Sequence, residues 1–347
     1  MTFRKAVEVL AVIIILALIV FAVFRILNPE DSGSGIQRFS KTELLMDTVF
    51  EIAVFTEDEA EGNRLLREAF SEVRMLEKTL SRFISGSEVD NINQAAGENP
   101  VEISSDSLQV IKEGIYLGEV SQGSFDITIA PLMDLWGFST GEQRVPTPEE
   151  IEETLLLIDY TEVDINEQRN TVYLPREGMS LDLGGIAKGY IVDRIIQYLE
   201  SQDVETAFVN AGGDIRVIGN RPDGTPWRIG IRSPRNREGQ DLIAVIPISD
   251  QAVVTSGDYE RFFTSDGIRY HHILDPSHGY PAAEAISVSI VARECMAADG
   301  LSTAIFVLGP QKGIELLESL PGIEGIIIDT EEKVHVSSGL QDIVEIR

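Results

Sequence analysis

Two kinds of hydrophobic pattern divide the chain into predicted helices and strands. In several segments apolar residues recur at intervals of three and four positions, a spacing that places them along one face of a helix. The first such stripe runs from Leu65 to Leu80, and a cluster of Ser and Asp residues suited to helix capping precedes the second. The predicted helices cover residues 59–80, 105–120, 186–200, 296–308 and 311–320.

Short apolar segments separated by turn residues predict strands. One comes early in the chain, and most of the others follow residue 160 as neighbouring strands with helices set between them. This order predicts an α+β fold rather than a doubly wound parallel sheet. The predicted strands cover residues 45–55, 171–175, 179–183, 206–219, 227–234, 242–249, 251–258, 267–276, 285–292, 322–330 and 334–339.

The N-terminal segment follows neither pattern, because Val7 to Phe24 is apolar apart from Glu8. As a helix, at about 1.5 Å per residue, it would reach about 27 Å, close to the thickness of a bilayer core. It has neither the shorter apolar run nor the small-residue cleavage site of a signal peptide, so we expect an uncleaved transmembrane anchor over residues 1–27. Residues 28–39, rich in Pro, Gly and Ser, predict a linker to a body over residues 40–347.

Charge and cysteine content limit the partners and the location. Arg4 and Lys5 precede the apolar segment, which favours a cytoplasmic N-terminus and an extracytoplasmic body on a single-pass cell-membrane protein, although Arg25 follows it. The 57 acidic residues against 28 basic ones give a formal charge of −29, which repels phosphate backbones and excludes nucleic acid as an expected partner. With one cysteine, Cys295, the chain cannot form an internal disulfide.

Two glycine pairs each end a predicted strand. In LDLGGIAKGY, residues 181–190, Asp182 precedes Gly184 and Gly185, and a helix follows. Glycines permit close approach of a ligand, and a helix start offers N–H groups to an anion. In VNAGGDIRVIG, residues 209–219, a second strand ends in the same way with a carboxylate after the glycines. Each is compatible with a plain turn or a β-bulge, and together they favour a shared ligand cleft without naming the ligand.

Asp299 and Thr303 lie four residues apart in a predicted helix. Positions i and i+4 share one helix face, so this carboxylate and this hydroxyl could converge on one hard cation. The same spacing is common on solvated helix faces and at helix caps. The surrounding residues are apolar, however, and a carboxylate near a buried surface needs a partner.

Three of the four histidines stand in HHILDPSHGY, residues 271–280. This stretch is compatible with a metal site, with a catalytic base in a tight turn, or with polar residues of a hairpin. Alternation along a strand points His271 and His272 to opposite faces, which disfavours a zinc site built on both.

Eight segments in a fixed order along the chain resemble the FAD:protein FMN transferase (ApbE) family, the flavin transferases. The resemblance covers about residues 40–345. The segments are MDT (46–48), LSRFISGSEVDNIN (80–93), GSFDITIAPLMDLWGF (123–138), LDLGGIAKGYIVD (181–193), FVNAGGDIRVIG (208–219), VTSGDYERFF (254–263), YHHILDPSHGYPA (270–282) and CMAADGLSTAIF (295–306).

The resemblance implies a single ApbE-like, T-fold-like domain of mixed, largely antiparallel sheets with packed helices. Members of the family bind FAD and Mg²⁺, cleave the pyrophosphate and join FMN through a phosphoester to a Thr or Ser of a partner flavoprotein, with release of AMP. Some members instead hydrolyse FAD to FMN and AMP. The chemistry suits the chain, because phosphoryl transfer needs charge neutralisation and an aligned nucleophile above all.

The resemblance also assigns residues to roles. Asp299 and Thr303 match the family's Mg²⁺ ligands, with the backbone carbonyl of Gly185 as a third, and Asp182 and Lys188 match positions that contact FAD. The positions that line the flavin and adenosine pockets match Met46, Phe83, Ser124, Phe125 and Asp126.

His272 matches a family histidine expected to contact FAD and to deprotonate the acceptor hydroxyl, as an imidazole titrating near about pH 6.5 can do. Two departures from the family pattern bear on ligand detail. Asp47 stands where Gly is usual, and Phe83 stands where Tyr is often found.

Three other functions remain compatible with the sequence. The first is a Mg²⁺-dependent FAD pyrophosphatase, in which water replaces the acceptor hydroxyl. The second is a non-enzymatic, membrane-tethered flavin-binding module, against which the presence of Asp299, Thr303 and His272 counts. The third is a zinc hydrolase built on the clustered histidines.

Overall fold

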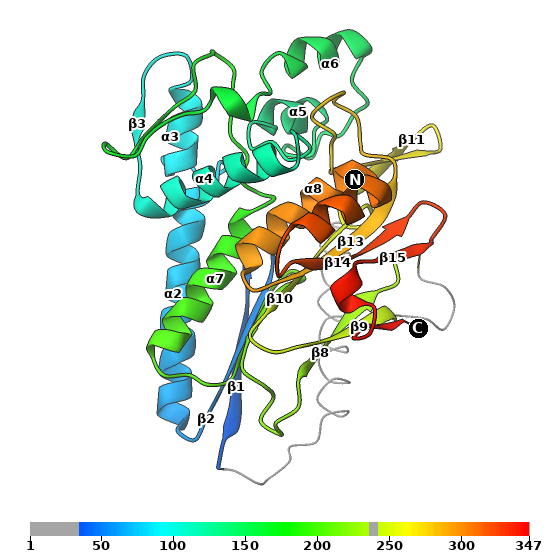
Figure 1. Cartoon of the computed structure of the whole chain (residues 1–347). Coiled ribbons are helices and arrows are strands. Elements are labelled where there is room, and N and C mark those ends of the chain that lie inside the picture. The colour runs from blue at the N-terminus through cyan, green and yellow to red at the C-terminus, as the bar shows by residue number, and fades with distance from the viewer. Residues whose placement is uncertain (1–34, 236–241, 347) are drawn as a thin grey trace, which may run out of the picture. The chain divides into compact units, whose positions relative to one another are not determined.

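The computed structural model describes residues 35–235 and 242–346, and its largest element is an eight-stranded sheet (Figure 1). The strands follow the order β1-β2-β6-β7-β10-β13-β14-β15, and each neighbouring pair is antiparallel. Their bounds are β1 Gln37–Leu45, β2 Thr48–Thr56, β6 Ala207–Ala211, β7 Asp214–Ile218, β10 Ala252–Gly257, β13 Ala285–Ala292, β14 Glu324–Asp329 and β15 Val334–Val336.

Three long helices cover one face of this sheet (Figure 1): α2, Glu59–Leu80, α7, Ala187–Ser201, and α8, Cys295–Ser319. The α2 helix packs on β1 and β2, α7 on β6 and β7, and α8 on β10, β13 and β14. The apolar stripes of these helices and the facing strand residues form the main hydrophobic core.

The opposite face of the sheet carries a second, smaller core. A three-stranded sheet in the order β16-β9-β8 contributes to it from β8, Trp227–Arg232, and β9, Leu242–Ile248, while β16 is Glu345–Ile346. Because β13 lies between two cores, all eight of its residues are buried. Six of its eight residues are apolar, and Ser287 and Ser289 are buried with them, as expected of a strand covered on both faces.

Shorter elements complete the fold. The helices α3 to α6 and a three-stranded sheet, β3-β5-β4, lie between α2 and α7 in the chain, and the hairpin β11–β12 lies between β10 and β13. A third apolar cluster joins residues near α5, α6 and this hairpin around the fully buried Trp136. The bounds are α3 Glu88–Gln94, α4 Ser105–Val120, α5 Ala130–Leu135, α6 Pro148–Leu155, β3 Val101–Glu102, β4 Asp164–Asn166, β5 Thr171–Tyr173, β11 Phe262–Ser265 and β12 Ile268–His271.

The structure confirms the α+β class, the antiparallel sheets and the main helices. The helices predicted over residues 59–80 and 105–120 have the observed bounds of α2 and α4. The pair predicted over 296–308 and 311–320 corresponds to α8, which is interrupted at Gly309 by a non-helical conformation, φ 75°, ahead of Pro310.

One predicted strand starts three residues too early, and another is wrong. The segment 45–55 contains a turn at Met46 and Asp47, so that β2 begins at Thr48 and pairs with an unpredicted strand, β1. Residues 179–183 form no strand. The side-chain amide of Asn93 takes the place of a neighbouring strand there, because it accepts from the Leu181 N–H at 2.7 Å and donates to the Leu181 carbonyl at 3.0 Å.

The β1–β2 turn explains the departure at Asp47. Both turn residues have positive φ, 52° at Met46 and 56° at Asp47, as a two-residue hairpin turn of type I′ requires. Glycine adopts this conformation without steric cost, Asp tolerates it, and a β-branched residue does not. We expect the free energy of unfolding of Asp47→Gly, measured in urea, to equal or exceed that of wild type. That of Asp47→Val should be lower than wild type by about 1–2 kcal/mol. An Asp47→Val variant as stable as wild type would contradict this account of the turn.

The predicted anchor, residues 1–27, and most of the predicted linker lie outside the described residues. Strand β1 begins at Gln37, so the sheet starts within the segment predicted as linker rather than at residue 40. Within residues 35–235 and 242–346, no helix is both long and apolar enough to cross a membrane.

Candidate functional site

The N-termini of α7 and α8 meet and cap each other through carboxylates. Asp193 of α7 accepts from the first backbone N–H groups of α8, those of Cys295 and Met296, both at 2.8 Å. Asp299 of α8 accepts in turn from the Gly189 N–H in the first turn of α7, at 3.0 Å. An anion at a helix N-terminus is stabilised by the free N–H groups and the helix dipole. This reciprocal capping fixes Asp299 at the crossing of the two helices.

Lys188 lies between two buried carboxylates. Its Nζ is 3.2 and 3.3 Å from the two oxygens of Asp299 and 2.9 Å from Oδ2 of Asp214, the first residue of β7. Burial disfavours the charged ammonium, but the two carboxylates outweigh this and raise the pKa of Lys188 above its ordinary value. Burial and the charge of Asp299 raise the pKa of Asp214, against the opposing effect of Lys188.

Oxygen atoms that could bind a metal lie one helical turn beyond Asp299. A Cβ placed on Gly185 would lie 3.6 Å from Oγ1 of Thr303, so the Thr303 hydroxyl is next to the Gly185 backbone. The same position would lie 3.2 Å from the Phe125 ring. Ser256 of β10 joins the group, with its Oγ 3.4 Å from Thr303 Oγ1. The predicted metal ligands Gly185, Asp299 and Thr303 are therefore brought together, as is the predicted aromatic residue Phe125.

Arg82 connects three of the segments that the sequence singled out. Its guanidinium pairs with Asp134 at 2.6 Å, donates from Nε to Asp182 at 3.0 Å, and lies 4.6 Å from the centroid of the Phe83 ring. Asp182 also accepts from the Gly184 N–H at 2.8 Å, which ties this cluster to the Gly185 corner. Phe83 is 61% exposed, which leaves part of its side chain accessible to a planar ligand.

The β1–β2 turn is attached to the end of α2 and to the second glycine corner. The Met46 N–H donates to Oε1 of Glu77 at 2.6 Å. The Gly212 N–H donates to the Val49 carbonyl at 3.0 Å, and Asp214 follows Gly212 by two residues. Met46, with its positive φ, is thus held near the strand that carries Asp214.

Asp126 is buried and makes hydrogen bonds within the protein. It is 8% exposed and accepts hydrogen bonds from the Thr128 N–H and hydroxyl, at 2.7 and 2.6 Å, and from the Tyr160 N–H at 3.0 Å. Burial raises its pKa despite these bonds. Contact of Asp126 or its neighbour Ser124 with FAD stays a prediction, whereas the internal role of Asp126 is observed.

His272 is held by Arg261, the residue that precedes β11. The Arg261 carbonyl accepts from the His272 N–H at 3.1 Å and lies 3.2 Å from its Nδ1. Because a carbonyl only accepts, Nδ1 carries the proton and Nε2 is left able to accept one. Burial, then the positive charge of Arg261, lowers the pKa of His272 to about 3, and Lys188 acts on it in the same sense. The expectation of titration near pH 6.5 is therefore corrected.

The other histidines have structural contacts. His271 is buried, with Nε2 2.9 Å from the Ala282 carbonyl and Nδ1 accepting from the Ile273 N–H at 3.3 Å. His278 pairs with Asp275 at 3.1 Å in the exposed turn that follows. Among the described residues, no group of three or more His, Cys, Asp or Glu side chains is placed to hold a metal. The structure gives no support to a zinc site in this stretch.

The turn after His272 is anchored to the buried Trp136. The Trp136 Nε1–H donates to the Gly279 carbonyl at 2.8 Å, and the indole packs against Tyr270 and Tyr280. Trp136 is fully buried and belongs to the core, which leaves no face for a flat ligand. Phe138, two residues later, meets the His272 ring edge-on at 6.5 Å.

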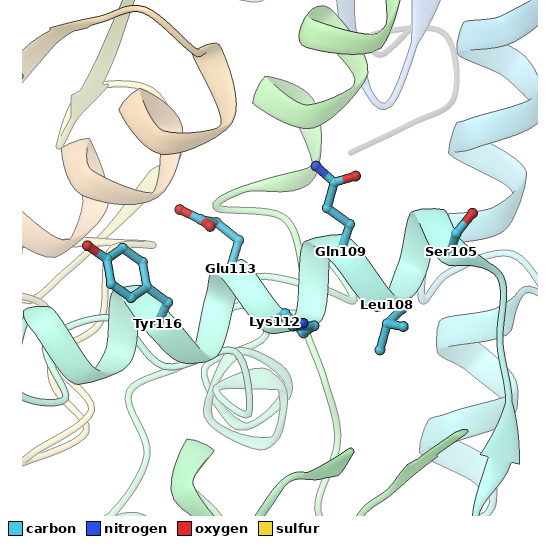
Figure 2. Close-up of a pocket in the computed structure, with 6 residues that line it drawn as sticks. All are labelled: Ser105, Leu108, Gln109, Lys112, Glu113 and Tyr116. Atoms are coloured by element: carbon cyan, nitrogen blue, oxygen red, sulfur yellow. The ribbon is translucent and has the colours of Figure 1, made fainter. Parts of the chain in front are cut away.

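An open pocket elsewhere does not contain the predicted site. It has a volume of about 390 Å³ and lies along α4 (Figure 2), where it is lined by Ser105, Leu108, Gln109, Lys112, Glu113 and Tyr116. Figure 2 shows Gln109 and Glu113 on one side of the helix and Leu108 on the other. None of the residues predicted from the sequence lines this pocket.

Three residues at the site had no role assigned from the sequence. Asp214 was visible only as the carboxylate after a second glycine corner, and Ser256 and Arg82 stood inside segments that carried the resemblance. Their contacts, with Lys188, Thr303 and Asp182 respectively, join residues 26 to 100 positions apart in the chain, as hydrogen bonds and ion pairs show. Pairings over such distances leave no local pattern.

A model of the ApbE family matches residues 46–327. The chain belongs to the ApbE family. The match includes every residue predicted for the site. The FAD:protein FMN transferase of Treponema pallidum (strain Nichols) is 34% identical over 326 residues, 90% of this chain and 90% of that protein.

Two solved ApbE structures share the fold. The ApbE protein of Thermotoga maritima superposes with a TM-score of 0.82 at 36% identity, covering 88% of this chain and 99% of that one. The flavin transferase ApbE from Vibrio cholerae gives a TM-score of 0.80 at 33% identity, covering 89% of this chain and 99% of that one. The ApbE fold therefore extends over nearly the whole described part of this chain.

Proposed function

We propose that this protein is a Mg²⁺-dependent FAD:protein FMN transferase that attaches FMN to a Thr or Ser of a partner flavoprotein and releases AMP. Relatives with this name match most of the chain. The observation that carries the proposal is the convergence of Asp299, Thr303 and Gly185 beside the Lys188 ammonium, at the crossing of α7 and α8. Oxygen donors and a cation together suit a phosphate substrate.

The donor set fits Mg²⁺. Asp299 supplies a buried carboxylate, 2% exposed, and Thr303 supplies a hydroxyl beside the Gly185 backbone. Mg²⁺ is a hard cation that takes few protein ligands and prefers oxygen. Bound by Asp299, Thr303 and the Gly185 carbonyl, it would neutralise charge on the phosphate oxygens of FAD.

The protein's own groups would then do four things. Phe83, Phe125 and Met46 would contact the flavin, and Lys188 would oppose the negative charge of the pyrophosphate. The negative charge of the bound pyrophosphate would raise the pKa of His272 from its low value in the ligand-free protein. The acceptor oxygen would attack the phosphorus of the FMN moiety, its proton would pass to Nε2 of His272, and the bond from that phosphorus to the bridging oxygen would break so that AMP leaves. Asp182 and Arg82, joined at 3.0 Å, would keep the Phe83 loop in place.

A transfer assay tests the proposal. The full-length protein is incubated with FAD, Mg²⁺ and a series of candidate acceptor domains, each paired with a variant whose target Thr or Ser is Ala. We expect one acceptor to gain the mass of FMN less water, with one AMP released per flavin attached and no gain in its matched Ala variant. AMP formed at the same rate without an acceptor would identify a pyrophosphatase instead. No attached flavin and no AMP with any acceptor would overturn the proposal.

We also propose that residues 1–27 anchor the protein in the cell membrane, with its body outside the cytoplasm. The apolar run from Val7 to Phe24, with Arg4 and Lys5 before it, supports this orientation. The protein should sediment with membranes at high salt, and protease added to spheroplasts should digest its body. A protein released by salt, or protected from external protease, would contradict the anchor or the orientation.

A further inference from the structure

Two buried carboxylates share one ammonium at the helix crossing. The side chains of Asp214 and Asp299 are 4% and 3% exposed, and Lys188 Nζ lies within 3.3 Å of both. This three-residue set, Asp214, Lys188 and Asp299, carries one negative charge in excess. A buried carboxylate without a cation is strongly unfavourable, so each depends on the same ammonium for its stability.

The contacts of the two carboxylates differ. Asp299 accepts from the Gly189 N–H and from Lys188, whereas Oδ2 of the buried Asp214 accepts no hydrogen bond and has the ammonium 2.9 Å away as its ionic partner. Asp214 therefore has unused capacity to accept a hydrogen bond from Lys188. Asp299 is the carboxylate that the proposed function assigns to Mg²⁺, and its two oxygens are the ones that Lys188 contacts.

We propose that Lys188 is an internal cation that competes with Mg²⁺ for Asp299, and that Asp214 is the carboxylate that retains Lys188 when Mg²⁺ takes Asp299. The inference rests on the proposed metal site. An ammonium within 3.3 Å of both Asp299 oxygens stands where a divalent cation has to bind, and two cations on one carboxylate repel each other. Movement toward Asp214 Oδ2 keeps the ammonium paired and leaves it inside the site, available to the pyrophosphate.

Metal affinity in the absence of FAD tests this exchange. Mn²⁺, a stand-in for Mg²⁺ whose free concentration is read by electron paramagnetic resonance, is titrated into the full-length protein. Lys188→Met removes the ammonium and keeps the apolar stem, and Lys188→Arg keeps the charge. We expect Lys188→Met to bind Mn²⁺ at least about tenfold more tightly than wild type, and Lys188→Arg to remain within about threefold of it.

The double variant Lys188→Met/Asp214→Asn separates competition from net charge. It has the same excess of one negative charge as wild type and leaves only one buried carboxylate without a cation, so it guards against misfolding of the single variant. We expect it also to bind Mn²⁺ more tightly than wild type. Affinity equal to or weaker than that of wild type in this variant would overturn the competition.

The failure of this inference differs from the failure of the proposed function. Wild-type protein that binds Mn²⁺ and transfers flavin, with unchanged affinity in both Lys188 variants and the double variant, would remove the exchange and leave the function standing. Loss of Mn²⁺ binding in Asp299→Ala is expected in either case. Wild-type protein that binds no Mn²⁺ would overturn both the metal site and the exchange.

Discussion

Replacing Asp299 by Ala is expected to abolish Mg²⁺-dependent flavin transfer, with a loss of at least about a thousandfold in kcat/KM. The metal in phosphoryl transfer supplies several kcal/mol of transition-state stabilisation, and each factor of ten in rate corresponds to about 1.4 kcal/mol. Asp299 is the one carboxylate of the proposed ligand set, and it is buried at the meeting point of α7 and α8. Transfer of FMN to the acceptor, followed by mass spectrometry over a range of Mg²⁺ concentrations, measures the loss.

A matched variant separates this effect from damage to the helix. Lys312 is exposed on the same helix, and Lys312→Ala should transfer flavin at the wild-type rate. Asp299→Ala also removes the acceptor for the Gly189 N–H, which we expect to cost about 1 kcal/mol of stability without unfolding the protein. A folded Asp299→Ala protein with more than about a tenth of wild-type activity would refute the metal assignment.

Replacing His272 by Ala is expected to lower kcat for flavin transfer by about 10²–10⁴ while the affinity for FAD changes little, because general base catalysis contributes an effect of this size. The Arg261 carbonyl fixes the proton on Nδ1, so Nε2 faces away from it as the acceptor. His278→Ala, in the exposed turn of the same segment, should leave kcat within about twofold of wild type. Equal losses in the two variants would point to damage of the turn rather than loss of a base.

The lowered pKa of His272 gives an expectation for stability against pH. Burial and Arg261 hold its pKa at about 3, below the value near about 6.5 of the unfolded chain. Between these values the unfolded state binds a proton that the native state does not, so the native protein loses stability as pH falls from about 6.5 toward about 3. His272→Ala removes this contribution. Urea unfolding at pH 7.5 and at pH 5 should therefore show wild type losing more stability on acidification than the variant.

Local patterns in the sequence were sufficient for the long helices α2, α4, α7 and α8 and for most of the strands, whereas the short helices α3, α5 and α6 were not predicted. The stripe from Leu65 to Leu80 predicted α2 because one face of that helix is buried against the sheet, and the gap between the helices predicted over 296–308 and 311–320 contains the break in α8 at Gly309. The turn at Met46 and Asp47 was missed because it lacks the Asn-Gly or Asp-Gly pair that normally signals such a hairpin.

Within the site, the relative positions of residues in one segment could be predicted from the sequence. Contacts between residues of two different segments could not. The separation of Asp299 and Thr303 by one helical turn follows from the period of the helix. The pairing of Lys188 with Asp214 and the reciprocal caps of Asp193 and Asp299 depend on how α7 crosses α8 and β7, which no spacing records. The pKa of His272 depends likewise on its burial and on the charge of Arg261, which directly precedes β11.

The most direct test of the account is a count of products with an acceptor of known target residue. Wild-type protein, FAD and Mg²⁺ should yield one covalently attached FMN per target Thr or Ser and an equal amount of AMP, and both should disappear with Asp299→Ala or with chelation of the metal. Flavin attached at an equal rate in Asp299→Ala, or in the presence of a chelator, would contradict the central claim that this helix crossing is a metal-dependent site of flavin transfer.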